Sequence, residues 1–215
     1  MPNKDDKMIM VVRRGLLLPD GAFEGFRPAS EINYESRILG NFEYQRRGNM
    51  EADPSFKQPI PYTMLVNPEK KTVYVYRRAD GHDEEKLAKK MSWGIGGHIE
   101  KRDENEEDNE DNPIHAAATR ELSEETSIRG RIYEMRPLGY VNTETEKDDG
   151  VHRVHFGILY VAETDAVIAI PTNPKKTGRM EEIASLDEIM SNPDLNVEEW
   201  SRIALQPLKE YFSAI

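Results

Sequence analysis

The segment that follows Asn112 constrains the fold more than any other part of the chain. Asn is a preferred N-cap residue, and Pro113 suits the first helical position, where its missing N–H is not needed. Apolar residues then recur at i, i+4 and i+8, at Ile114, Ala118 and Leu122. This pattern predicts a helix from Pro113 to about Thr126 with a narrow apolar stripe, small enough to pack closely on a sheet.

The same helix carries three glutamates, Glu121, Glu124 and Glu125, at i, i+3 and i+4. That spacing places the carboxylates on one face, where they repel one another unless a cation intervenes. Hard oxygen donors at this density suit Mg²⁺, Mn²⁺ or Ca²⁺. A solvated, Glu-rich helix face without any ion is the alternative that the helix alone leaves open. Gly96 and Gly97 weigh against it, because they end an apolar, strand-like run and let a backbone carbonyl approach a metal.

Strand and turn patterns lie on both sides of this helix. A β-branched and aromatic hairpin is predicted from strands at residues 62–66 and 72–77. The other predicted elements are a strand starting at residue 8, strands at 138–142 and 151–162, and an amphipathic helix at 194–212 that breaks near Pro207. This order predicts the α/β (α+β) class with a mixed sheet.

Composition narrows the classes of function. The 215 residues include 29 basic and 40 acidic ones, hence a net charge of -11, which disfavours general binding to nucleic acid. The absence of cysteine excludes disulfides, zinc–thiolate sites and thiol nucleophiles. The sequence has no apolar run long enough for a signal peptide or a membrane span, so we expect a cytoplasmic protein without a membrane partner.

Two stretches together resemble the Nudix box, the motif of the Nudix hydrolases. They are Gly96-Gly97-His98-Ile99-Glu100 and Arg120-Glu121-Leu122-Ser123-Glu124-Glu125-Thr126-Ser127-Ile128. The resemblance implies a Nudix-type α/β/α sandwich with a mixed sheet over residues 59–215. Residues 1–58 would be an N-terminal extension packed on that core, and a candidate contact in a homodimer.

Two departures from the box stand out. Counted from Gly97, the family's first glutamate falls on Asp103, and 16 residues instead of seven separate it from Arg120. We infer an acidic insertion at 103–111, in which seven of nine residues are acidic. In the family the first glutamate holds the arginine in position, and we expect Asp103 or another carboxylate of the insertion to brace Arg120 in this way. Ser127 replaces the box's last glycine, which we expect to cost some stability at the helix C-terminus without removing a ligand.

The resemblance implies a pyrophosphohydrolase that needs Mg²⁺ or Mn²⁺. The metal ligands that it implies are the Gly96 carbonyl and the carboxylates of Glu121, Glu124, Glu125 and Glu182, with Glu181 in reserve. Arg120 would orient Glu121, the carboxylate closest to removing a proton from the attacking water. The substrate would be a nucleoside diphosphate linked to another group, which no subfamily mark after the box identifies.

Two other classes of protein share this fold. A Nudix-fold nucleotide-binding or regulatory protein without catalysis usually lacks one of the helix glutamates, and all three are present here. A Nudix-like isomerase acting on a prenyl diphosphate needs a catalytic cysteine in its common form, and this chain has none. His98 receives no role, because it is at a position where the family varies. His152 and His155 fall on a predicted strand and need not face the site.

Overall fold

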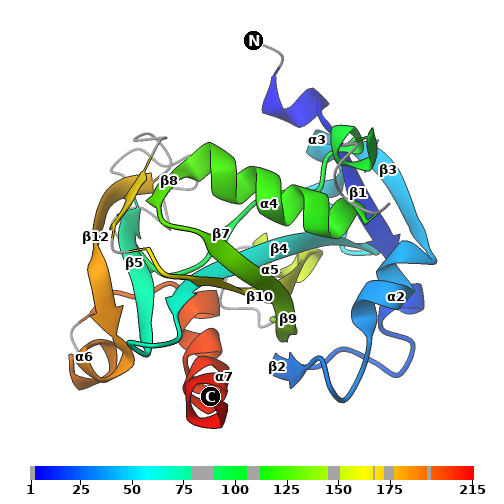
Figure 1. The fold of residues 1–215 in the computed structure, drawn as a ribbon. Helices are drawn as coiled ribbons and strands as arrows, with labels where there is room; N and C mark the ends of the chain where they lie inside the picture. Colours follow the sequence, from blue (N-terminus) through cyan, green and yellow to red (C-terminus); the bar gives the residue numbers. More distant parts are fainter. Residues whose placement is uncertain are drawn as a thin grey trace. The chain divides into compact units, whose positions relative to one another are not determined.

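The structure is a computed structural model that describes residues 3–78, 90–105, 112–144, 151–166, 168–171, 177–192 and 195–215. The chain divides into two compact units. The first comprises Met1–Tyr62, Gly96–Thr119 and Leu138–Leu159, and the second comprises Thr63–Ile95, Arg120–Pro137 and Tyr160–Ile215. Four long elements contribute residues to both units: β4 (Phe56–Asn67), α4 (Pro113–Glu125), β9 (Ile132–Asn142) and β10 (His155–Thr164) (Figure 1).

In the first unit, an almost fully buried strand near the N-terminus pairs on both sides. β1 (Met8–Arg13) is antiparallel to β3 (Phe42–Arg46) and to the start of β4, so that Val12 lies opposite both Phe42 and Lys57. β2 (Gly25–Pro28) pairs antiparallel with the end of β9. Residues 8–13, which the sequence placed in an N-terminal extension, are therefore part of a sheet in this unit, while the predicted domain boundary at residue 58 stays a prediction.

Short helices and two side-chain clusters complete the first unit. The helices are η1 (Lys4–Asp6), α1 (Arg14–Leu17), α2 (Tyr34–Leu39), α3 (Arg47–Met50), η3 (Lys101–Asn105) and α5 (Val151–Val154). One core cluster consists of Ile9, Val11, Met50 and Phe56. The other is aromatic, with ring centroids 5.0 to 6.1 Å apart, and consists of Phe23, Tyr34, Tyr140 and Phe156. Such contacts add to the stability that area burial alone provides.

In the second unit, β5 (Thr72–Arg78) is the strand around which the others pair. It is antiparallel to the end of β4, to β6 (Met91–Ser92) and to β12 (Thr177–Ser185). The turn from β4 to β5 is closed by Asn67, whose side chain accepts a hydrogen bond from the Lys70 backbone at 3.1 Å. The predicted hairpin is thus confirmed. β7 (Ile95–Gly96) pairs with β4, and β8 (Thr126–Arg129) forms a two-stranded sheet with β11 (Ile168–Pro171).

Helix α4 begins where the sequence predicts. The Asn112 side chain accepts a hydrogen bond from the backbone N–H of Ile114 at 3.1 Å, which is the expected cap. The stripe residues of this helix are buried, and Leu122 packs in the core of the second unit. Its partners there are Leu65, Tyr74, Tyr76, Ile95, Ala162 and Ala166. Burying a leucine contributes about 1.5–3 kcal/mol, so this contact holds the end of the helix on the sheet.

Three elements differ in extent from the prediction. β4 starts at Phe56, and all of its 12 residues are buried. Because both faces of the strand are buried, its sequence does not alternate between apolar and polar residues, which is the usual signal of a strand. Residues 151–154 form α5 before β10 begins. α7 (Glu199–Ala214) begins later than predicted and continues through Pro207. Its buried face includes Trp200, Leu208 and Phe212, and this packing offsets the roughly 3 kcal/mol that an interior proline costs.

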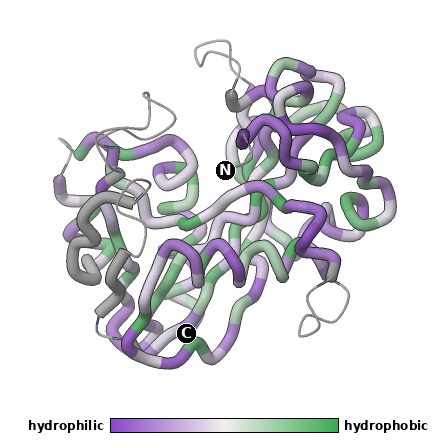
Figure 2. The backbone as a smooth tube through the Cα atoms, turned by 90° about the horizontal axis from the view of Figure 1, so that it is seen from above, coloured by the Kyte–Doolittle hydropathy of each residue, from purple (hydrophilic) through white to green (hydrophobic). Residues whose placement is uncertain are grey.

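The α/β (α+β) class is confirmed. β4, β10 and β9 are neighbours in that order in the main sheet, and α6 (Leu186–Ser191) and α7 follow the last strand. A capping box between Ser185 and Glu188 starts α6. In Figure 2, hydrophobic and hydrophilic stretches alternate along the chain, and no helix in the described segments is long and apolar enough to cross a membrane. The sequence at residues 82–91 is a charged segment for which a helical connection is an expectation, and most of it lies outside the described residues.

Candidate functional site

The C-terminal half of α4 holds a buried ion pair. Arg120 and Glu121 side chains are each only 5% exposed, and Arg120 Nη1 lies 2.6 Å from Glu121 Oε1. The same nitrogen lies 3.5 Å from Glu124 Oε2, one helical turn further on. Buried charges are costly unless paired, so Arg120 fixes the orientation of Glu121 and draws Glu124 towards the pair. The contact that the sequence predicted between Arg120 and Glu121 is therefore present, while its catalytic role stays a prediction.

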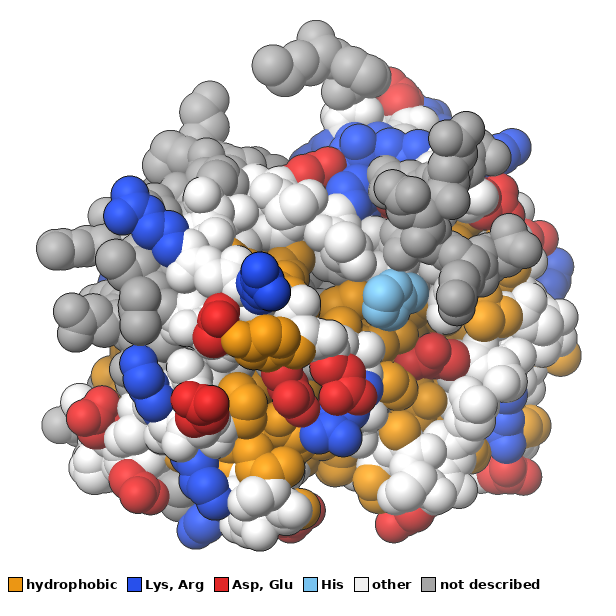
Figure 3. Space-filling model, viewed as in Figure 1, with side chains coloured by type: hydrophobic (Ala, Val, Ile, Leu, Met, Phe, Trp, Pro, Cys, Tyr) orange, Lys and Arg blue, Asp and Glu red, His pale blue; other side chains and the backbone are white. Residues whose placement is uncertain are grey.

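The three helix glutamates differ in their access to solvent. Glu121 and Glu125 are buried, whereas the Glu124 side chain is 45% exposed. Glu124 is therefore the carboxylate that an ion from solution can reach most directly. On the face shown in Figure 3, acidic and basic side chains lie interspersed around hydrophobic ones, so that face does not have the uniform negative charge that the composition would suggest.

Helix α4 ends without the glycine that the box usually provides. It passes directly into β8, where Ser127 pairs opposite Ile170, so position 127 has strand backbone that any residue can adopt. The Thr126 hydroxyl donates to the Leu122 carbonyl at 2.6 Å and thereby satisfies one of the last helix acceptors. The expected loss of stability at Ser127 has no basis in this geometry, because no left-handed residue is required there.

Gly96, the predicted carbonyl ligand, lies in β7 against the backbone of β4. A Cβ at this position would be 2.3 Å from the Pro61 carbonyl oxygen and 3.3 Å from Tyr62 Cα. Both contacts are to backbone, which cannot move away as a flexible side chain would. The glycine is therefore explained by close packing of two strands, whether or not its carbonyl also binds a metal.

We expect Gly96→Ala to lower the free energy of unfolding by about 1–3 kcal/mol, the usual cost of overpacking a filled interior. The matched control is Gly15→Ala, because a Cβ on Gly15 meets nothing within 4 Å and the residue lies in helix α1. Urea denaturation of both variants measures the difference. Equal stability of the two variants would show that β7 and β4 are not packed this closely in solution.

Asp103, which takes the place of the family's first glutamate, has a local structural contact. It is buried, and its carboxylate accepts a hydrogen bond from the Glu100 backbone N–H at 2.7 Å, which closes the turn leading into η3. This contact accounts for a short acidic side chain here. A brace on Arg120 stays a prediction, and the rest of the acidic insertion, residues 106–111, lies outside the described residues.

The predicted metal ligands fall into three groups. Glu121, Glu124 and Glu125 lie on α4 in the second unit, and Gly96 belongs to the first unit. Glu182 and its reserve Glu181 fall on β12, but their side chains lie outside the described residues. The structure thus brings Arg120 into contact with Glu121 and with Glu124. That Gly96, the three helix glutamates and Glu182 bind a metal stays a prediction.

The sequence did not predict a network of charged side chains around the buried Lys57. Lys57 is fully buried, and its Nζ lies 2.9 Å from Glu144 and donates to the Arg153 carbonyl at 2.8 Å. Arg14 donates to both Glu144 oxygens, at 3.2 and 2.6 Å. Burial alone would raise the pKa of Glu144, but the hydrogen bonds from Arg14 and Lys57 outweigh it and lower the pKa to about 2. The residues are distant in sequence, so no local pattern links them.

Comparison with known proteins supports the fold. No protein-family model matches the chain. It is 28% identical over 225 residues to Protein YmaB of Bacillus subtilis (strain 168), across 96% of this chain and 99% of that protein. Because this alignment covers nearly the whole chain, it includes most of residues 1–58. The same holds for the solved structure of Tm1382.

Solved structures that resemble the chain include two with a TM-score above 0.5. Tm1382, described as a candidate Nudix hydrolase, has a TM-score of 0.74 and 24% identity, covering 95% of this chain and 100% of that one. The Nudix domain of Shewanella oneidensis NrtR has a TM-score of 0.52 and 13% identity, covering 72% of this chain and 88% of that one. Because both sequence identities are below 25%, the similarity shows the fold alone. The chain has the fold of the Nudix superfamily, as its box at residues 97–128 predicts.

Proposed function

We propose that this chain hydrolyses a phosphoanhydride bond in a nucleoside diphosphate linked to another group, with Mg²⁺ or Mn²⁺ as cofactor. The observation that carries the proposal is the end of α4, where buried Arg120 pairs with Glu121 and contacts exposed Glu124. The Nudix fold supports the proposal, as does the description of Tm1382 as a candidate Nudix hydrolase.

The residues of α4 fit a hard divalent cation. Three carboxylates within about one helical turn offer the oxygen donors that Mg²⁺ prefers. Arg120 offsets part of their charge, and Glu124 faces solvent. Glu121, Glu124 and Glu125 would hold the ion, with the Gly96 carbonyl and Glu182 as further proposed ligands. When bound, such an ion neutralises phosphate oxygens and lowers the pKa of a bound water.

The chain's own residues supply orientation and proton removal. Arg120 is a positioning residue, because its Nη1 holds Glu121 Oε1 at 2.6 Å within a buried environment. We assign to Glu121 the removal of the proton from the attacking water. The water oxygen bonds to phosphorus, the bond from phosphorus to the bridging oxygen breaks, and the leaving phosphate takes the electron pair. A positioned general base contributes about 10²–10⁴-fold to such a rate.

The test is product release from a panel of diphosphate compounds, including ADP-ribose, dinucleoside polyphosphates and nucleoside triphosphates, with Mg²⁺, Mn²⁺ or EDTA. ADP-ribose is included because the solved NrtR Nudix domain is a complex with it. We expect at least one compound to be cleaved with either metal and none with EDTA. Cleavage that is unchanged in EDTA would contradict the metal-dependent mechanism.

A second candidate is a nucleotide-binding protein without hydrolysis. The observation that favours it is Asp103, which replaces the family's first glutamate and whose carboxylate caps the turn at Glu100. Calorimetry on the same panel separates the two candidates. A compound that binds with Mg²⁺ but yields no product over hours would support binding alone, whereas a compound that both binds and is cleaved would exclude it.

A further inference from the structure

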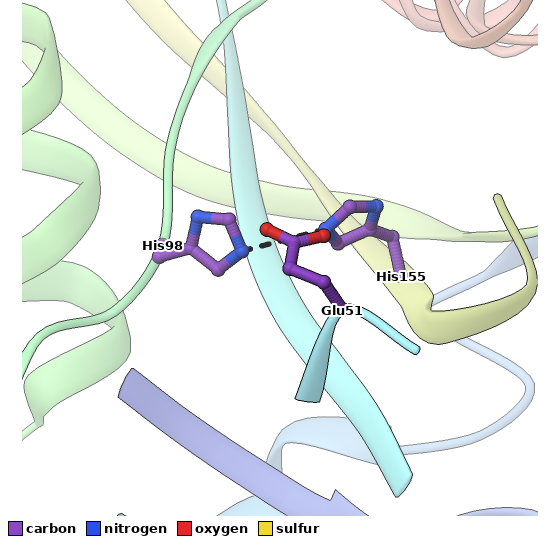
Figure 4. A group of neighbouring side chains, drawn as sticks. All are labelled: Glu51, His98 and His155. Carbon is purple, nitrogen blue, oxygen red and sulfur yellow. Dashed lines mark hydrogen bonds between the residues drawn. The ribbon is translucent and has the colours of Figure 1, made fainter. Parts of the chain in front are cut away.

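Three side chains from distant parts of the first unit converge at a place that the Nudix box does not explain. Glu51 follows helix α3, His98 follows β7, and His155 is the first residue of β10. One donor atom from each lies within 4.8 Å of the other two. Figure 4 shows the Glu51 carboxylate next to both imidazole rings, with a hydrogen bond joining the rings. All three residues belong to the same compact unit.

We propose that Glu51, His98 and His155 form a binding site for a divalent transition metal, with Zn²⁺ as the expected occupant. This site shares no residue with the carboxylates of α4, and the inference does not depend on the proposed hydrolysis. Imidazole nitrogens suit Zn²⁺ and its neighbours in the first transition row, whereas Mg²⁺ prefers oxygen donors throughout. Two imidazoles with one carboxylate are therefore selective for a different metal from the one proposed on α4.

The separation of the two histidines matches a zinc site. Zinc–nitrogen bonds are about 2.0–2.1 Å long, so two imidazole ligands at the tetrahedral angle lie roughly 3.3–3.4 Å apart. His98 Nε2 and His155 Nε2 are 3.4 Å apart, with the two ring centroids at 5.3 Å and an interplanar angle of 63°. Both rings thus direct the same nitrogen to one point, at a spacing that a tetrahedral ion requires.

The surrounding contacts orient the proposed ligands. Arg47 donates to Glu51 Oε1 at 2.7 Å, which holds the carboxylate through one oxygen and leaves its second oxygen as a ligand. Lys57 Nζ lies 3.5 Å from the His155 backbone carbonyl and fixes the start of β10. Hydrogen bonds that hold a ligand in position are usual around metal sites. The Glu51 side chain is 33% exposed, so it has room to move the short distance needed to complete the site.

Gln58 provides a separate observation that points to a ligand at this place. It is completely buried, and its Oε1 lies 2.6 Å from His98 Nε2, a contact that an incoming ion must displace. Its amide nitrogen has no hydrogen-bond partner among the described residues. A buried amide N–H without a partner calls for a hydrogen-bond acceptor, which a water bound to the proposed ion would supply. With three protein ligands, the proposed metal keeps a fourth position for water, which is the arrangement of catalytic rather than structural zinc sites.

The experiment uses Co²⁺ as a spectroscopic probe. The full chain is treated with EDTA, dialysed and titrated with Co²⁺, and Zn²⁺ is then added to displace it. We expect one equivalent of Co²⁺ to give the strong visible absorption of a tetrahedral site, and Zn²⁺ to remove it. Co²⁺ bound by the α4 carboxylates and water would instead be octahedral and absorb weakly, so the spectrum distinguishes the two sites.

Variants decide whether the three residues are the ligands. His98→Gln and Glu51→Gln are expected to weaken Co²⁺ binding by more than the roughly 10–100-fold caused by losing a side chain that only hydrogen-bonds to a ligand. His115→Gln, a histidine of α4 outside the cluster, should leave both affinity and spectrum unchanged. His155 is buried, so His155→Gln is judged only where circular dichroism shows a native fold. No tetrahedral absorption with wild-type protein, or the same absorption and affinity in the folded His98→Gln variant, would overturn the proposal.

Discussion

Glu124→Gln is expected to lower the metal-dependent hydrolysis rate at least about 100-fold, because it removes the charge of the proposed ligand that solvent reaches. The Glu124 side chain is 45% exposed, and exposed substitutions usually change stability by less than about 0.5 kcal/mol. The loss should therefore appear in steady-state rates at fixed Mg²⁺ while the melting temperature stays that of the wild type. Raising the Mg²⁺ concentration should restore part of the rate.

The matched control is Glu134→Gln, an exposed glutamate on β9 in the same compact unit. It makes the same chemical change and the same change in net charge, so a general electrostatic effect on an anionic substrate would appear in both variants. We expect the control to retain the wild-type rate. If Glu124→Gln also retains it at limiting Mg²⁺, Glu124 is not a metal ligand and the proposed site on α4 is wrong.

Local sequence was sufficient to predict how the residues at the centre of the candidate site are arranged. The cap at Asn112, the stripe ending at Leu122 and the contact of Arg120 with Glu121 and Glu124 all arise within a few residues of one helix. Helical periodicity fixes which of these side chains are neighbours, so their arrangement follows once the helix is recognised. The fold class followed from the same helix and from the hairpin at residues 62–77.

Contacts between distant segments could not be predicted in this way. His98 and His155 are 57 positions apart, and only the pairing of whole strands brings their rings together. The sequence around Lys57 is polar and suggests an exposed side chain. The residue is nevertheless fully buried, because it forms an ion pair with Glu144 and donates a hydrogen bond to a backbone carbonyl. Pro207 indicated a helix break, and the packing of α7 outweighed that local preference. In each case tertiary contacts decided the outcome, and the sequence carries no periodic signal for them.

Glu144→Gln is expected to lower the free energy of unfolding at neutral pH by about 3 kcal/mol, the lower end of the range for breaking a buried ion pair. The Glu144 side chain is 20% exposed while Lys57 is fully buried, so the variant leaves the Lys57 charge without its carboxylate. Urea denaturation at pH 7 measures the loss. Glu31→Gln, at an exposed position of the same unit, is the control and should remain within about 0.5 kcal/mol of the wild type.

A double variant, Lys57→Met with Glu144→Gln, tests whether the unpaired Lys57 charge causes the loss of stability in Glu144→Gln. Removing both partners of a buried pair is often close to neutral, so we expect the double variant to be more stable than Glu144→Gln alone. If it is less stable by the sum of the two single losses, the two side chains do not interact and the network is not the cause.

The stability that Glu144 contributes should also depend on pH in a defined window. Its pKa in the folded chain is about 2, below the ordinary 4.5, so the folded state favours the ionised carboxylate. The contribution is therefore complete above about pH 4.5 and disappears as the pH falls towards 2. The stability curves of wild type and Glu144→Gln should be parallel above this window and converge within it. A constant difference down to pH 2.5 would mean that Glu144 is not held ionised by Arg14 and Lys57, and that the loss in the variant has a steric origin.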